Sequence, residues 1–488
     1  MRERLARLGP NVAVALALGM LAYRFRELGL SPFILDEPAF LTAAREQLQT
    51  GRWASLSPIA GSQGVRYGPS VVWFYGVVQA VAGPDPRASI LAMCLLVTLA
   101  QLVLAWSVAR AFGGGRLLFA VLLAFIAASP FQFFWARLAW DPLANVAACL
   151  TVALLASRER FGAGKAVALG LVLGIGLSSH PMIVPLVVAV AVLLVVDLRR
   201  TPRRLFGWGG LTAGAMLLVN VPYLLHLLRE PQRGGSAPGF TWAALGDFLR
   251  ATGQVSTSWG TRYFFDDQWD VFLAWLGPLR AVLQPSPVLL WIVLGVAVPG
   301  FLAGIRAGGA HRRLAVFATG TWLGYALFYA YAVENLGRQP HYEFPVWWVV
   351  PVGVAGALAW ARRRSAAWGG TAVAVVLATS VLHFAFIAAW MAFVKAQGGI
   401  RGIHYSTPIA LQQQAVRTAC AEPERELLLR NETLIFPEAL RYLATVEPAC
   451  AGKQVAICSH EGCPAAEPGA KVLTLVYARE TGGAVGWR

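Results

Sequence analysis

Long apolar segments, separated by short polar ones, recur along the first 394 residues of the chain. A helix needs about 20 apolar residues to cross a bilayer core about 30 Å thick, with roughly 17 to 25 tolerated. The predicted spans lie at 10–24, 88–110, 117–136, 142–157, 166–179, 182–197, 205–228, 287–305, 314–333, 345–361 and 369–394. We therefore expect an all-α polytopic membrane protein with about eleven transmembrane helices.

The arginine-rich loops decide which side of the membrane each span faces. They lie at 158–165, 199–204, 306–313 and 362–364. The apolar stretch 69–83 is only about 15 residues long, and if it crossed the membrane all four loops would face outward, against the preference of basic loops for the cytoplasm. We therefore predict that 69–83 is re-entrant or interfacial, with the amino terminus inside and the carboxyl terminus outside. The basic start also fits a signal peptide, but no small-residue cleavage site precedes Tyr23.

The composition supports membrane insertion over nucleic-acid binding. The chain has 41 Lys and Arg against 25 Asp and Glu, a net charge of +16, yet only 14% of its residues are charged and 57% are hydrophobic. Soluble proteins carry about 25% charged residues. Since the arginines lie between apolar segments, we predict a membrane partner and no nucleic acid. The excess of Arg over Lys indicates a GC-rich genome and favours a bacterial inner membrane.

Residues 395–488 are less apolar and form a predicted separate domain beyond the transmembrane domain 1–394. The stretch 471–479 alternates as a strand does. Four of the six cysteines lie in this tail, and an even set outside the cytoplasm favours two disulfides. Three connectivities stay open, and a zinc site that includes His460 is the alternative. We expect a small α+β extracytoplasmic domain.

Two outer-face loops, 25–87 and 229–286, are long enough to carry chemistry, and the first contains an acidic pair. Asp36 and Glu37 follow the first predicted span, and Pro38 fits the first position of a helix. Apolar residues then recur at helical spacing, which predicts an amphipathic helix on the membrane surface. Asp36 could serve only as a helix cap. However, charge at a membrane surface is costly and commonly functional.

A second polar pair lies between two later spans. Arg137 and Asp141 are spaced i and i+4 within the segment 129–145. This spacing fits an ion pair at a helix end or an arginine that extends to the interface beside a capping aspartate. Both interpretations stay open from the residues alone.

Together, the two segments resemble the GT-C membrane glycosyltransferases, in the protein O-mannosyltransferase and aminoarabinose-transferase branch. The resemblance covers about residues 10–395 in layout, and its motifs are the segments around Asp36 and Asp141. It implies a GT-C fold and transfer of a sugar from a polyprenyl-phosphate lipid. The acceptor would be a hydroxyl on a lipid, glycan or protein. It also implies inversion at the anomeric carbon and no nucleotide sugar.

Within this resemblance, Asp36 is the expected general base, and Glu37 or Asp141 would stabilise positive charge on the sugar ring. A fixed cation would stabilise the departing phosphate. The candidates for the donor phosphate are Arg137, Arg66, Tyr67, Arg338, His341 and His180. Arg66 and Tyr67 end a glycine-rich loop that also fits a flexible turn, and His180 also fits a packed core residue. The family often has arginine before the tyrosine where this chain has His341, so the role lies between His341 and Arg338.

Oxygen donors suited to Mg²⁺ or Mn²⁺ are present, but no spacing defines a metal site. They are Asp36, Glu37, Asp141 and Glu343. We expect a reaction with no metal or with weak assistance from one. We expect a solvated interfacial loop around Asp266, Asp267 and Asp270.

Other functions fit parts of the sequence. The alternatives are a transporter or flippase, or a polysaccharide-assembly protein, for lipid-linked sugars; a transporter would need ionisable groups near the midplane. A membrane acyl- or phosphotransferase would need a histidine with a partner, and neither His180 nor His383 has one at a recognisable spacing.

Overall fold

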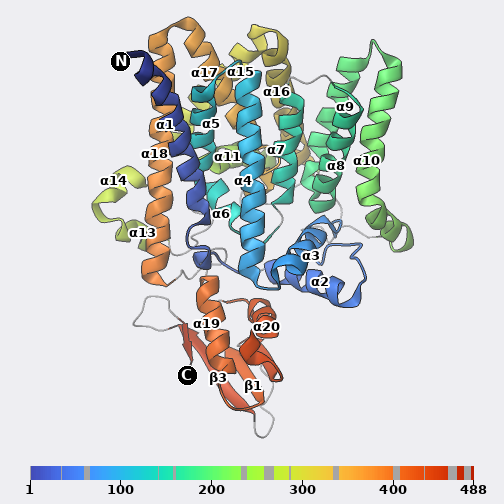
Figure 1. Ribbon diagram of the computed structural model, residues 1–488, viewed down its shortest axis with the longest axis vertical. Coiled ribbons are helices and arrows are strands. Elements are labelled where there is room, and N and C mark those ends of the chain that lie inside the picture. Colours follow the sequence, from blue (N-terminus) through green and yellow to red (C-terminus); the bar gives the residue numbers. More distant parts are fainter. Residues whose placement is uncertain are drawn as a thin grey trace.

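The computed structural model describes residues 2–34, 36–59, 66–140, 142–157, 161–231, 239–257, 269–284, 287–332, 340–398, 407–433, 435–459, 470–477 and 485–487. A bundle of long helices stands on a smaller domain of helices and strands (Figure 1). The amino terminus lies at the end of the bundle far from the small domain, and the carboxyl terminus lies in the small domain.

Every segment predicted as a span contains a helix. The helices are α1 (Arg2–Ala22), α4 (Pro86–Ala111), α5 (Arg116–Ala127), α6 (Pro130–Ala136), α7 (Leu143–Ala156), α8 (Ala163–Ser179), α9 (Val184–Leu198), α10 (Pro202–Arg229), α15 (Pro287–Ala307), α16 (Gly309–Ala332), α17 (Val349–Arg364) and α18 (Ala366–Gln397). By length and composition, four described helical segments can each cross a membrane alone, namely α4, Pro181–Leu198, α10 and α18. The bent pair α5 and α6 would make a fifth, and shorter apolar helices fill much of the remaining bundle.

The segment 117–136, predicted as one span, consists of two helices. The chain bends by 68° between α5 and α6. The side chain of Ser129 accepts a hydrogen bond from the backbone N–H of Gln132, and Pro130 occupies the first turn of α6. Both features mark the start of a helix. The N–H groups of the first turn have no partner within the helix; a capping hydroxyl bonds to one of them, and proline has no N–H group that needs a partner. The break turns α6 into the interior of the bundle.

Two short helices lie at the end of the bundle that faces the small domain. They are α2 (Glu37–Thr50) and α3 (Ser70–Ala82), and they lie side by side near the lower end of α4 (Figure 1). The thirteen residues of α3 are too few for a straight crossing, as predicted for this apolar stretch.

The region 229–286, expected as an outer loop, contains a buried helix. The described helices of this region are α11 (Trp242–Val255), α13 (Trp269–Trp275) and α14 (Arg280–Leu283). In α11, Phe248, Ala251 and Val255 are fully buried, and the helix packs on α16. Their spacing of three and four residues places them on one helical face.

The small domain is an α+β unit. It comprises α19 (Ile409–Cys420), β1 (Glu426–Asn431), α20 (Pro437–Val446), β2 (Gln454–Ser459), β3 (Lys471–Tyr477) and β4 (Val485–Trp487). The strand order is β2-β1-β3-β4, with β1 parallel to both neighbours and β4 antiparallel to β3. The strand predicted over 471–479 is confirmed for Lys471–Tyr477, and residues 478 and 479 lie outside the described residues.

Disulfides close this domain, as predicted for the tail. Cys420, at the end of α19, is bonded to Cys450. Cys458 is also disulfide-bonded. Cys463 and His460 lie outside the described residues.

Candidate active site

Asp36 stands at the start of α2, at the end of the bundle that faces the small domain. It occupies the N-cap position, but its side chain makes no capping hydrogen bond. Instead it forms a hydrogen bond with the side chain of Trp140. Burial raises the pKa of Asp36 to about 6, and the bond to Trp140 acts in the opposite direction. A half-buried carboxyl group with this pKa can accept a proton near neutral pH.

Glu37 has a different environment from its neighbour. Its side chain is 1% exposed. One carboxylate oxygen accepts a hydrogen bond from the backbone N–H of Ile34 at 2.6 Å, and the other from that of Ala139 at 2.7 Å. Burial raises the pKa of Glu37 to about 8, although both N–H donors favour the charged form. Because both oxygens are engaged, Glu37 fastens the start of α2 to the turn that follows α6.

Arg137 holds the same turn to the segment that follows α1. Its guanidinium is fully buried and donates to the carbonyl oxygens of Arg24 at 2.9 Å, Arg26 at 2.7 Å and Glu27 at 2.8 Å. Glu27 has a positive φ of 51°. That conformation is unfavourable for a residue with a side chain, and the bond from Arg137 helps to hold it.

A row of rings extends from Asp36 across the bundle end. We call Trp140, Trp135, Phe344, Tyr342, His180 and Tyr67 the aromatic row. Trp135 lies 4.7 Å, between ring centroids, from both Trp140 and Phe344. Tyr342 precedes Phe344 by two residues in the chain, and its ring is 5.6 Å from that of His180. Ligand pockets are commonly lined by aromatic surfaces with a few placed polar groups.

The far end of the row joins two residues predicted to bind phosphate. The rings of Tyr67 and His180 lie 4.8 Å apart. Gly68, next to Tyr67, has no room for a side chain, because a Cβ added there would collide with Ser178 on α8. His180 accepts a hydrogen bond at Nδ1 from the N–H of Met182, and burial lowers its pKa to about 3. A neutral His180 can act as a dipole toward an anion but not as a cation.

The other predicted site residues are distributed as follows. Arg66 has an exposed side chain, and its carbonyl oxygen accepts a bond from the hydroxyl of Tyr223. Asp141, Arg338 and the side chain of His341 lie outside the described residues. Trp140, which precedes Asp141 in the sequence, is the residue that contacts Asp36.

Glu343, one of the oxygen donors considered for a metal, is fully buried. It is 0% exposed, and burial raises its pKa well above the usual value. Among the described residues, no three His, Cys, Asp or Glu side chains gather in a group suited to a metal ion.

Comparison with solved structures identifies the architecture. The chain is similar to the crystal structure of ArnT from Cupriavidus metallidurans in the apo state, with a TM-score of 0.52 and 15% identity, over 93% of this chain and 90% of that one. The chain has the fold of ArnT. A structure of the same ArnT bound to undecaprenyl phosphate matches with a TM-score of 0.49 and 15% identity, over 91% of this chain and 89% of that one. No family model matches the sequence, and no curated protein matches it.

The ArnT fold confirms the predicted GT-C architecture with its small carboxyl-terminal domain. Sequence reasoning missed a buried polar network inside this fold. Arg24 donates to the side chain of Gln101 and to the carbonyl oxygen of Ile126, while Gln101 and Asn145 both donate to Oε1 of Gln132 at 2.7 Å. The available signal was a glutamine in the middle of a predicted span, since polar groups within a membrane protein are rarely incidental.

Proposed function

We propose that this protein is a membrane glycosyltransferase that moves a sugar from a polyprenyl-phosphate donor to an acceptor hydroxyl. The reaction takes place at the end of the bundle that carries α2 and α3. The observation that carries the proposal is Asp36, a half-buried acid with a pKa of about 6 at one end of the aromatic row. As the acceptor oxygen attacks the anomeric carbon, its proton passes to Asp36 and the bond from that carbon to the phosphate oxygen breaks.

The class of donor is proposed from the fold and from the chemistry of the site. The ArnT whose apo structure shares this fold has also been crystallised with undecaprenyl phosphate. For this chain we propose a lipid of the same class, with its tail in the bilayer. Sugar rings have apolar faces, and we propose that the partly exposed rings of Trp140, Tyr342 and Tyr67 contact the sugar.

Positive charge near the site supports departure of a lipid phosphate. Arg24 and Arg137 are both 0% exposed, and neither forms an ion pair with any acid that the structure describes. Their guanidinium groups bond mainly to carbonyl oxygens and leave a net positive potential at this end of the bundle. We propose that Arg137 acts through this potential, and that Arg66 and Tyr67, with Arg338 and His341, reach the phosphate directly.

The remaining acids receive separate roles in this proposal. Because backbone N–H groups engage both oxygens of Glu37, we assign Glu37 to positioning α2. Asp141 is then the candidate that stabilises positive charge on the ring. We also propose a bacterial inner membrane, with the basic loops in the cytoplasm and the small domain outside.

The proposal is tested with purified protein in lipid vesicles. Radiolabelled polyprenyl-phosphate sugars are supplied with a membrane lipid extract, and label on a new acceptor is measured. Asp36→Asn should lower turnover by at least about 10²-fold, as expected when a general base is lost, with donor binding retained. Asp85→Asn is the matched control, because Asp85 caps α4 and pairs with Arg87 at the same end of the bundle. Undiminished turnover in Asp36→Asn would reject Asp36 as the base. Label that crosses the bilayer without changing carrier would instead indicate a flippase.

A further inference from the structure

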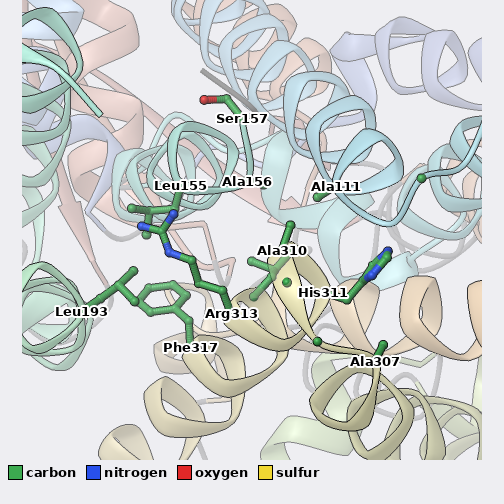
Figure 2. A pocket seen from close by; sticks show the side chains of 14 residues that line it. Ala111, Leu155, Ala156, Ser157, Leu193, Ala307, Ala310, His311, Arg313 and Phe317 are labelled. Atoms are coloured by element: carbon green, nitrogen blue, oxygen red, sulfur yellow. The ribbon is translucent and has the colours of Figure 1, made fainter. Parts of the chain in front are cut away.

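Two hollows flank the turn between α15 and α16, at the end of the bundle that carries the amino terminus (Figure 1). The turn is made by Gly308 and Gly309, whose φ angles of 76° and 56° favour glycine. Just beyond it, the side chains of His311 and Arg313 leave α16 on different sides (Figure 2). This end has no part in the proposed transfer reaction.

The first hollow, of about 730 Å³, is electrostatically balanced. Figure 2 shows Arg313 extending across it toward Leu155, with Leu193 and Phe317 beside it. Arg313 forms an ion pair with Asp197 on α9. Because this cation already has an acidic partner, the first hollow has little preference for an anion.

The second hollow, of about 690 Å³, is strongly basic. It lies between α15 and α17, and Arg306, Arg363 and Arg364 stand at its rim. None of the residues that line it is acidic, and these three exposed arginines form no ion pair with any acid in the described ranges. Trp360 stands beside them, with the guanidinium of Arg364 5.4 Å from its ring. Three cations that form no ion pair with a described acid favour an anionic ligand.

The wall of the second hollow is apolar and faces outward. Pro299, Leu302 and Ala303 of α15 form it, and Leu302 is 51% exposed. Next to this wall the two helices are in backbone contact, since a Cβ at Gly356 would lie 2.5 Å from the carbonyl oxygen of Gly300. Glycines of this kind let membrane helices approach closely.

We propose that the second hollow binds an anionic phospholipid of the surrounding membrane. The phosphate lies among Arg306, Arg363 and Arg364, and the acyl chains follow the apolar wall. Basic pockets between transmembrane helices bind acidic lipid headgroups in this way. A neutral lipid would leave the arginines unpaired, and a free phosphate would leave the apolar wall exposed. The proposal is independent of the transfer reaction.

Lipid retention by the full-length protein tests whether the second hollow binds an anionic phospholipid. The protein is purified in detergent, titrated with phosphatidylglycerol or phosphatidylcholine, and bound lipid is counted by native mass spectrometry. We expect the wild type to retain phosphatidylglycerol at least tenfold more tightly. Arg306→Gln/Arg363→Gln should lose that preference. Arg200→Gln is the matched control, an exposed arginine at the same end that lines neither described hollow, and it should keep the preference.

Two further measurements separate the lipid from simpler explanations. Raising the salt concentration from 0.1 M to 1 M should weaken phosphatidylglycerol binding in the wild type, because the ion pairs are exposed. The salt measurement uses only the wild-type protein, so it does not depend on the folding of a variant. Equal retention of both lipids by the wild type, an unchanged preference in the double variant, or competition by millimolar inorganic phosphate that removes all bound lipid would each overturn the proposal.

Discussion

Asp36 and Trp140 form the pair on which the proposed chemistry depends. Burial raises the pKa of Asp36 to about 6, and the hydrogen bond from Trp140 limits that rise. A base must be ionised to accept a proton, so activity should be low below about pH 6 and should increase as the pH passes through that value. The same side chain in water would be ionised already near pH 4.

Trp140→Phe tests the origin of this pKa. The substitution removes the hydrogen bond that favours the carboxylate, so the midpoint of the pH–activity curve should move to a higher pH, while folding is retained. Turnover against pH is measured for the variant and for Trp53→Phe, an exposed tryptophan at the same end. A midpoint that stays in place, or moves to a lower pH, would contradict the assignment of Trp140.

Arg137→Gln separates a positioning role from direct phosphate binding. The variant loses bonds to three backbone carbonyl groups. Each hydrogen bond to a charged group contributes about 1.5 to 3 kcal/mol. We therefore expect a clear fall in the melting temperature in detergent, with Arg137→Lys restoring part of it. Unchanged stability combined with weaker donor binding would indicate that Arg137 binds the donor phosphate directly.

The sequence predicts helices well and contacts between distant segments poorly. The acid pair at 36 and 37 is predictable because it follows a span. The engagement of Glu37, however, depends on the N–H of Ala139, about a hundred residues away, as well as on that of Ile34. Tyr67 and His180 are both predicted site residues, but no periodicity relates them, so the sequence does not predict their contact. The break at Ser129 was visible as a cap followed by proline, and the criterion of a continuous apolar run concealed it.

Gly68→Ala tests how α3 is seated against α8. A Cβ at Gly68 would collide with Ser178, and overpacking of this kind costs about 1 to 3 kcal/mol. We expect lower thermal stability and a loss of turnover as Tyr67 moves away from His180. Gly164→Ala is the control, since nothing lies within 4 Å of its added Cβ, and it should be neutral. Adding Ser178→Gly to Gly68→Ala should restore part of the lost stability. If Gly68→Ala and Gly164→Ala lower stability equally, the close contact between Gly68 and Ser178 does not seat α3.

At the level of the whole molecule, the small domain supports the segment that leads to Asp36. The backbone N–H of Ile409 donates to the carbonyl oxygen of Ser31 at 2.8 Å, and the side chain of Gln412 donates to that of Phe33 at 3.2 Å. Tyr442 of α20 packs its ring on Phe33 and donates to the carbonyl oxygen of Pro84. The conformation of the segment before Asp36 therefore depends on a domain more than 370 residues away in the sequence.

The Cys420–Cys450 disulfide should therefore control activity from outside the bundle. It closes a loop with a sequence separation of 30, which in the chain-entropy model stabilises the domain by about 3.5 kcal/mol. Cys420→Ser/Cys450→Ser should make the tail sensitive to limited proteolysis while the bundle stays intact, and turnover should fall because the segment before Asp36 loses its support. Cys94→Ser is the control, since Cys94 is a buried free thiol of the bundle, and its tail should resist proteolysis. If the tail loosens and turnover is unchanged, the small domain does not position Asp36.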